Sequence, residues 1–72
     1  MEFDEKIFPK RLEELRLEKG LSQYKLAKNL GIATSAIQDW ESLKRRAGAE
    51  NLFKLSKYFG VSIDYLVGAR DE

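Results

Sequence analysis

The chain has 72 residues, of which 43% are hydrophobic and 35% are charged, with a single proline. This composition is typical of one small globular domain spanning residues 1–72, not of a disordered segment. Cysteine and histidine are both absent, which excludes disulfides, Cys/His zinc sites, thiol nucleophiles and a Ser-His-Asp triad. The chain is also too small for a deep cleft, so we expect neither an enzyme nor a metal or cofactor site.

The formal net charge of +1 is unevenly distributed along the chain. Residues 1–8 and 59–72 each carry −2, whereas residues 9–58 hold eleven basic and six acidic side chains, a net +5. A basic centre between acidic ends permits a polyanionic partner without proving one. No apolar run approaches the ~18–20 residues of a membrane span, and the acidic start is wrong for a signal peptide. We therefore expect a cytoplasmic protein without a membrane partner.

Glycines divide the middle of the chain into short pieces that lack an internal proline. Gly20, Gly31, Gly48 and Gly60 each follow a segment long enough for a short helix. β-branched residues are few, and no strict alternation of apolar and polar residues persists, so no sheet is expected. The sequence therefore predicts an all-α bundle of five helices. They are expected at about residues 9–19, 23–30, 34–42, 49–59 and 63–67.

The first two predicted helices have clear start and stop signals. Pro9 suits the first turn of a helix, where its missing N–H has no partner to lose. Ser22 is a good N-cap for the second helix, and Gly31 can end that helix in the left-handed conformation. The spacing of apolar side chains then predicts which residues face the core. In the first two helices these are Phe8, Leu12, Leu15, Lys19, Leu26, Ala27 and Leu30.

The same spacing assigns inward residues to the last three predicted helices, and Ser62 is the expected cap of the last one. The inward set is Ile37, Trp40, Leu52, Leu55, Phe59, Ile63, Leu66 and Val67. Trp40 is expected in the core and not as an exposed stacking platform. Leu17 lies off the inward face and is expected to be exposed.

The second and third predicted helices have the features of a helix-turn-helix unit. Ala27 lies four residues before Gly31, and Ile37 lies six residues after it. A steep, close crossing of two short helices needs a small residue in the first helix and an apolar residue in the second. The arrangement leaves the polar front of the third helix projecting, in a form that fits the major groove of DNA.

Five segments between residues 11 and 68 carry a resemblance to a known family. They are RLEELRLEKGLSQ, LAKNLGI, the Trp40-Glu41 pair, NLFKLSKYFGVS and IDYLVG. In this order the chain resembles the five-helix DNA-binding domain of lambda-like repressors and Cro proteins, also called the xenobiotic-response-element helix-turn-helix family. The resemblance covers about four fifths of the chain. It implies a sequence-specific transcriptional regulator, a repressor of the phage or prokaryotic Cro type that binds a double-stranded DNA operator as a homodimer.

The resemblance also implies roles for individual residues. In the family, the front of the third helix faces base edges, which here implies Thr34, Ser35, Gln38 and Asp39. Of these, Gln38 can pair bidentately with adenine, and Asp39 can accept a hydrogen bond from cytosine while repelling phosphates. The alternative interpretation is that these four side chains are simply the solvated face of a helix.

Phosphate contacts and one ion pair are implied in the same way. Gln23, at the start of the second helix, matches a glutamine that binds a DNA phosphate and braces the third helix. The loop after the third helix implies phosphate contacts from Lys44, Arg45 and Arg46, although a basic loop is often only solvated. Arg16 and Glu41 match a structural pair that fixes the third helix to the body.

The sequence departs from the family pattern on both sides of the third helix. Ala33 stands where the family usually has a Ser or Thr cap, so Thr34 or Ser35 is a candidate to cap one residue late. Leu43 stands where the family often has glycine. Because leucine disfavours positive φ, the loop is expected to take another path.

A second hypothesis is a helical protein-interaction module, or an antitoxin, on the same fold with the DNA face little used. Its partner is then a toxin or a C-terminal effector domain. In that case Gln38→Ala and Arg45→Ala leave activity intact, whereas substitutions at Leu43 or Tyr65 abolish it.

Overall fold

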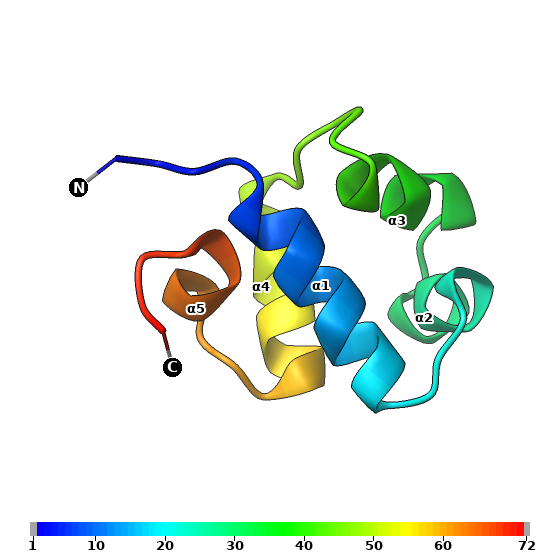
Figure 1. Ribbon diagram of the computed structural model, residues 1–72. Helices are drawn as coiled ribbons and strands as arrows, with labels where there is room; N and C mark the ends of the chain where they lie inside the picture. Colours follow the sequence, from blue (N-terminus) through cyan, green and yellow to red (C-terminus); the bar gives the residue numbers. More distant parts are fainter. Residues whose placement is uncertain (1, 72) are drawn as a thin grey trace.

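The computed structural model describes residues 2–71, and within them it contains five α-helices and no strand (Figure 1). The predicted all-α, five-helix fold is therefore confirmed. α1 starts two residues earlier than predicted and ends one residue earlier, α3 ends one residue earlier, and the other three helices have the predicted bounds. The helices are α1 (Ile7–Glu18), α2 (Gln23–Leu30), α3 (Thr34–Glu41), α4 (Ala49–Phe59) and α5 (Ile63–Val67).

α1 starts earlier than predicted because a turn at Asp4 prepares its first residues. The backbone N–H of Ile7 donates to the carbonyl of Asp4 at 3.2 Å, and the N–H of Lys6 donates to Asp4 Oδ1 at 2.9 Å. Pro9 is consequently the third helical residue and not the first. That position still belongs to the first turn, whose N–H groups have no partner within the helix, so proline costs no hydrogen bond there.

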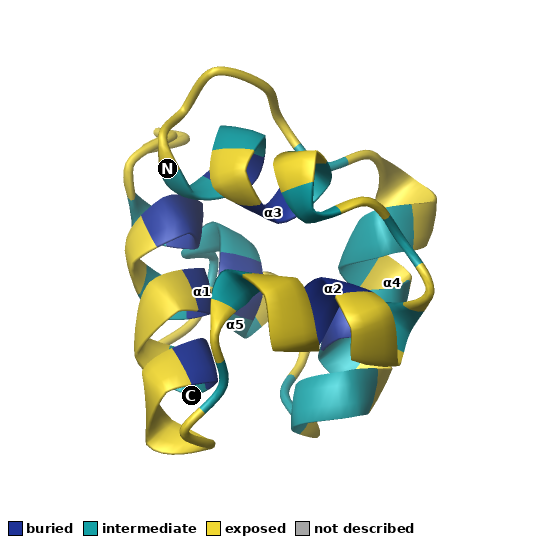
Figure 2. Cartoon of the chain, turned by 90° about the vertical axis from the view of Figure 1, so that its right-hand side faces the viewer, coloured by how far each residue is buried: buried dark blue, intermediate teal, exposed yellow. Residues whose placement is uncertain are grey.

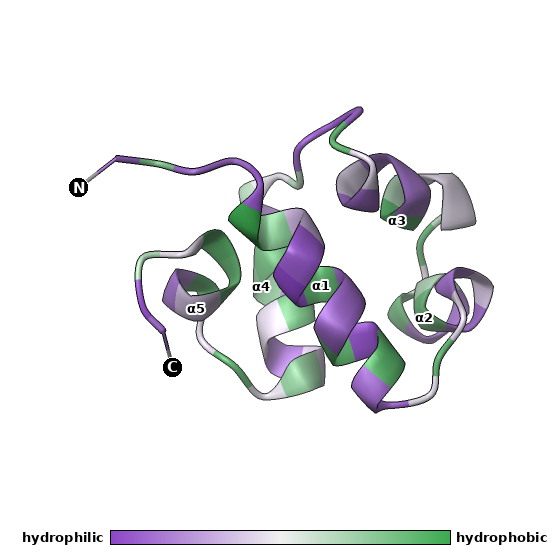
Figure 3. Ribbon diagram, in the orientation of Figure 1, coloured by the Kyte–Doolittle hydropathy of each residue, from purple (hydrophilic) through white to green (hydrophobic). Residues whose placement is uncertain are grey.

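One hydrophobic core joins all five helices, and it is formed by the inward residues of the sequence pattern. Figure 3 shows hydrophobic stretches of the ribbon turned towards the middle of the bundle and a largely hydrophilic loop after α3. The Phe8 and Trp40 rings meet in this core with centroids 6.4 Å apart. The buried apolar set is Phe8, Leu12, Leu26, Ala27, Ile37, Trp40, Leu55 and Leu66.

The inward face of α1 differs from the prediction. Lys19 was expected on this face but is exposed, while Arg16 is buried together with Phe8 and Leu12. Residues four apart stay on one side of an α-helix, so the positions after Phe8 and Leu12 lead to residue 16. Arg16 can remain there because each nitrogen of its charged group donates a hydrogen bond, as described below.

α5 lies on the opposite side of α1 and α4 from α2 and α3, and packs against both α1 and α4 (Figure 1). Leu66 is fully buried, but Ile63, predicted to point inward, is exposed. Residues three apart lie near the same side of a helix, so periodicity does not separate these two, and the packing of α5 against α1 and α4 covers only Leu66 completely. Gly68 ends α5 so close to α1 that a Cβ there would lie 2.7 Å from Ile7 Cδ1.

No helix within residues 2–71 combines the length and the apolar character needed to cross a membrane.

Candidate nucleic-acid interface

α2 and α3 form a helix-turn-helix unit along one side of the bundle. Gly31 ends α2 with φ 71°, a left-handed conformation that glycine adopts without steric cost. The N–H of Ile32 then donates to the carbonyl of Ala27 at 3.0 Å, which closes the turn. Ala27 and Ile37 are both buried where the two helices meet. The small side chain allows the close approach and the larger one fills the space beneath it.

A buried polar cluster fixes the end of α3 to α1 and α2. Arg16 donates from Nε to Glu41 Oε2 at 2.8 Å and from Nη2 to Glu41 Oε1 at 3.0 Å, so the expected ion pair is present and bidentate. Arg16 Nη1 donates to the carbonyl of Leu21 at 2.8 Å, and Gln23 Nε2 donates to Glu41 Oε1 at 3.0 Å. The Arg16 and Glu41 side chains are only 10% and 6% exposed. Four hydrogen bonds therefore satisfy two desolvated charges, as a buried pair requires.

The hydrogen bonds to Glu41 raise the pKa of Arg16 above its ordinary value, although burial acts in the opposite direction. The negative charges of Glu41 and Glu13 add to the increase. A raised pKa means that the stability gained from the pair is fully present below the ordinary arginine value and is lost only as pH rises above it. The anchor of α3 therefore stays charged on its arginine side at every pH near neutrality.

The four predicted base-contacting side chains lie on the side of α3 that is not packed on the core. Figure 2 views the molecule from this side, with exposed residues along α2 and α3 and buried ones behind them. Ser35 and Gln38 are exposed, and Thr34 and Asp39 are partly exposed. Within residues 2–71, no hydrogen bond involves the side chains of Thr34, Ser35 or Gln38. Their donors and acceptors are thus available to an external partner.

Asp39 differs from the other three because it already interacts with residues of the loop after α3. Its carboxylate Oδ2 lies 3.7 Å from Arg45 Nε, and its side chain is 24% exposed. Its carbonyl accepts from the N–H of Lys44 at 2.9 Å and from Ser42 Oγ at 3.3 Å. Asp39 therefore shapes the end of α3 in addition to bordering the outward face.

The start of α3 is uncapped. Ala33 is the N-cap residue, with extended backbone and no side-chain hydrogen bond. The late cap considered for Thr34 or Ser35 is wrong, because α3 already begins at Thr34 and neither side chain bonds its first turn. Because neither side chain caps α3, the hydroxyl groups of Thr34 and Ser35 have no hydrogen-bond partner within residues 2–71.

The loop after α3 does not take the path expected from its sequence. Leu43 adopts φ 66°, so the expectation that leucine forces another route is wrong. Two hydrogen bonds impose the conformation, from the N–H of Leu43 to the carbonyl of Trp40 at 3.4 Å and from the N–H of Lys44 to that of Asp39 at 2.9 Å. This is the Schellman pattern, normally built with glycine at this position. The Leu43 side chain is 40% exposed and lines a cavity of about 140 Å³ together with Phe8 and Trp40.

The three basic residues of this loop, predicted to contact phosphates, are all exposed but have different neighbours. Lys44 forms no ion pair within the described part of the chain. Arg45 lies near Asp39, as stated above. Arg46 Nη2 donates to Glu5 Oε2 at 2.8 Å, which joins the loop to the N-terminal segment.

One feature was missed by the sequence reasoning. Arg11 donates from Nη1 to the carbonyls of Tyr65 and Arg70, the latter at 2.7 Å, and its guanidinium lies 4.2 Å from the Tyr65 ring centroid. Arg11 follows Ile7 by four residues, so the spacing along α1 placed both on one side of the helix. No neighbouring residue indicated its partners, which lie more than 50 residues further along the chain.

Comparison with known proteins gives a consistent result. Residues 12–66 match the family model described as helix-turn-helix. The HTH-type transcriptional activator BcrR of Enterococcus faecalis is 41% identical over 71 residues, which cover 99% of this chain and 32% of BcrR. The HTH-type transcriptional regulator ImmR of Bacillus subtilis is 38% identical over 63 residues, covering 88% of this chain and 49% of ImmR. This chain thus spans about a third to a half of the length of these relatives.

Solved structures show the same similarity in three dimensions. The P22 c2 repressor, crystallised in complex with a synthetic operator, matches with a TM-score of 0.81 and 31% identity over 89% of this chain and 97% of the repressor chain. The restriction-modification controller protein C.AhdI of Aeromonas hydrophila matches with a TM-score of 0.77 and 35% identity, over 88% of this chain and 96% of that chain.

Proposed function

This chain belongs to the helix-turn-helix family, and from that premise we propose that it binds a specific sequence of double-stranded DNA and regulates transcription. One observation carries the proposal. The outward side of α3 holds polar side chains with free hydrogen-bonding groups, on a helix whose opposite side is fixed by Ile37, Trp40 and the Arg16–Glu41 pair. A rigid helix with an unused polar edge is what major-groove recognition needs.

Each predicted contact has a distinct chemical role in this proposal. Gln38 bonds adenine N6 and N7, while Thr34 and Ser35 bond base edges, with the Thr34 methyl against a thymine methyl. Asp39 accepts from cytosine N4 or rejects sites that place an acceptor opposite it. These base contacts supply specificity.

Phosphate contacts supply most of the affinity and its salt dependence. Gln23 bonds a phosphate with the part of its amide that Glu41 leaves free. Lys44, Arg45 and Arg46 provide charge along the backbone beside the groove. We also propose that the protein acts in the cytoplasm of a prokaryotic cell, because its curated relatives are bacterial and bacterial DNA lies there.

We propose binding as a homodimer, because one short recognition helix contacts few base pairs. Two helices placed about 34–36 Å apart reach successive major grooves and roughly double the binding free energy, less the cost of association. The exposed Ile63 at the start of α5 provides apolar surface for a second copy. Sedimentation of the wild type and of Ile63→Ser tests the homodimer and its contact. Loss of a dimer in the variant supports α5 as the contact. A wild-type protein that is a monomer on DNA contradicts the homodimer.

We further propose that the regulation is repression, the activity named for the structurally similar P22 c2 repressor, whereas BcrR is named as an activator. A reporter gene placed behind the selected operator tests whether the protein represses or activates transcription. Lower expression with the protein than without it supports repression, and higher expression contradicts it.

The direct test of DNA binding is selection of duplexes from a random pool, followed by salt titration on the selected sequence. Specific binding whose affinity falls steeply with salt supports the proposal. Lys44→Ala is expected to reduce the slope of log affinity against log salt by about 0.9 for each bound chain. Lys57→Ala, the same change on α4 outside the helix-turn-helix unit, is the matched control. Absence of any sequence preference contradicts the proposal.

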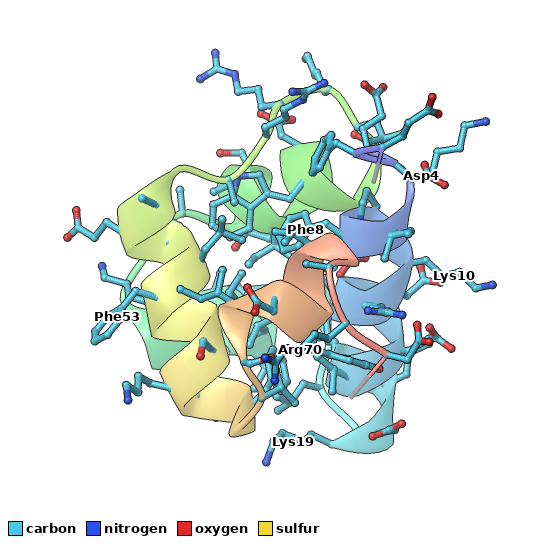
Figure 4. All side chains as sticks on the ribbon, turned by 90° about the vertical axis from the view of Figure 1, so that its left-hand side faces the viewer. Asp4, Phe8, Lys10, Lys19, Phe53 and Arg70 are labelled. Carbon is cyan, nitrogen blue, oxygen red and sulfur yellow. The ribbon has the colours of Figure 1, made fainter. Side chains whose placement is uncertain are left out.

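The alternative of a protein-interaction module has one observation in its favour. Phe53 projects from α4 away from the bundle and is one of the most exposed apolar residues in residues 2–71 (Figure 4). If a protein partner such as a toxin or an effector domain binds there, Phe53→Ser abolishes function in cells while leaving operator binding unchanged. If DNA binding is the function, Gln38→Ala has the larger effect.

A further inference from the structure

The N-terminal segment, residues 2–6, carries three acids and one base and lies beside the basic loop after α3. We call this segment the acidic arm. Asp4 sets its direction, because the side chain and the carbonyl of Asp4 accept from the N–H groups of Lys6 and Ile7. Figure 4 shows Asp4 at the start of α1, on the side of the molecule where the loop crosses over α3. The arm is thus placed next to residues 42–48 by hydrogen bonds and not by chance.

The hydrogen bond and the cation–π contact between the acidic arm and the loop within residues 2–71 both involve Arg46. Glu5 Oε2 accepts a hydrogen bond from Arg46 Nη2 at 2.8 Å, and the guanidinium carbon lies 5.3 Å from the centroid of the Phe3 ring. The carboxylate and the aromatic ring therefore hold the same cation. The Arg46 and Glu5 side chains are 68% and 54% exposed. An ion pair this exposed to water is weak and exchanges readily.

Arg46 is the only one of the three loop cations that an acid holds at hydrogen-bond distance within residues 2–71. Arg45 and Asp39 are 3.7 Å apart, and Lys44 has no ion pair in that part of the chain. A carboxylate and a phosphate present similar oxygen acceptors to a guanidinium. The Arg46 donor that bonds Glu5 is therefore not available to an approaching phosphate.

We propose that Glu5 is an affinity-determining residue of the DNA interface, an internal carboxylate that competes with a DNA phosphate for Arg46. The inference rests on the proposed DNA binding, and it adds a residue that lowers the affinity for DNA. Glu5 occupies the Nη2 donor of Arg46 in the free protein, and its negative charge repels an approaching phosphate. The acidic arm then sets how tightly the loop holds DNA without touching a base.

The test separates the contact from the net charge by comparing Glu5→Gln with Glu2→Gln. Both changes remove one negative charge from the acidic arm, but Glu2 has no ion pair within residues 2–71. Glu2 acts on Arg46 only through solvent, where charges are screened, so the contacting carboxylate of Glu5 is expected to have the larger effect. The probes are the selected operator duplex and a random-sequence duplex of equal length.

Glu5→Gln is expected to tighten binding to both duplexes by about two- to fivefold per bound chain at low salt, with a smaller gain at higher salt. Glu2→Gln is expected to stay close to the wild type. An equal gain from both variants, or no gain from Glu5→Gln, overturns the proposal. If the wild type binds both duplexes equally, the regulatory function fails, while the Glu5 comparison on the random duplex still decides this inference. If neither duplex binds, both fail.

Two further measurements exclude indirect effects. In an Arg46→Ala background Glu5→Gln is expected to give no gain, and a persisting gain overturns the proposal, because the pair then does not act through Arg46. Without DNA, the Nε–Hε resonance of Arg46 in an NMR spectrum is expected to shift in Glu5→Gln and to stay in place in Glu2→Gln. An unchanged resonance in both variants overturns the contact itself.

Discussion

The two ends of α3 are held in different ways. The C-terminal end is fixed by Glu41, whose carboxylate accepts three hydrogen bonds from Arg16 and Gln23 in a nearly dry environment. The N-terminal end begins at Ala33 without a side-chain cap, and its first polar side chains have no partners in the described chain. The anchor of α3 thus lies at its C-terminal end, while its start is held by backbone and packing without a side-chain cap.

The largest expected effect comes from breaking the anchored end. Arg16→Ala leaves the Glu41 carboxylate buried without its charged partner, so we expect a loss of about 3–5 kcal/mol in the free energy of unfolding. Because a core of this size supplies only about that much stability, the variant should be largely unfolded at 25 °C. Urea titration monitored by circular dichroism measures it, with the exposed Arg45→Ala as control. A loss below about 1 kcal/mol would contradict the anchoring role.

The outward side of α3 should show the opposite behaviour. Gln38→Ala is expected to change stability by less than about 0.5 kcal/mol, because the side chain is exposed and unbonded. It is expected to weaken operator binding by about 1–3 kcal/mol and to relax the preference at one base pair. Repeating the duplex selection with the variant measures both effects. An unchanged selected sequence would remove Gln38 from the base contacts.

Adding a cap to the N-terminal end of α3 sharpens the comparison. Ala33→Ser places a hydroxyl where it can accept from the first turn of α3, as Ser22 does for Lys25 in α2 at 3.0 Å. We expect a gain of about 1 kcal/mol in the free energy of unfolding. Ser22→Ala should lose a similar amount and is the matched control. If thermal unfolding shows no gain, the start of α3 is held by its packing alone.

The smallest effect concerns the left-handed residue that follows α3. Leu43→Gly removes both the side-chain packing and the cost of positive φ, whereas Leu43→Ala removes only the packing. We therefore expect Leu43→Gly to be more stable than Leu43→Ala by about 1 kcal/mol. Chemical denaturation of both variants gives the difference directly. Equal stabilities would mean that this conformation stores no strain.

Local signals were sufficient for most of the fold. Ser22, Gly31 and Gly60 mark helix ends by hydrogen bonding and by positive φ, which depend only on neighbouring residues, and the predicted bounds of α2 and α4 agree with the structure. The five-helix fold and the family are confirmed. The base and phosphate contacts remain predictions, because they depend on a partner molecule.

The errors about burial share one physical cause, which is that burial depends on residues far away in the sequence. Periodicity placed Lys19 inside and not Arg16, because it takes no account of the Glu41 carboxylate 25 residues further on. Ile63 was placed inside because its pattern is apolar, although the packing around α5 buries only Leu66 fully. In each case the neighbours supplied by packing decided the outcome.

The sequence by itself determined the helices, their order and a polar edge on α3, since propensity, capping and periodicity act over a few residues. The family resemblance predicted the Arg16–Glu41 anchor, but only the tertiary structure showed its burial and the Glu5–Arg46 contact. These pairs join residues 25 and 41 positions apart. The folded chain also showed that Leu43 takes a conformation that its own side chain disfavours. Coulomb and hydrogen-bond energies depend on distances in space, and only the folded chain brings these groups together.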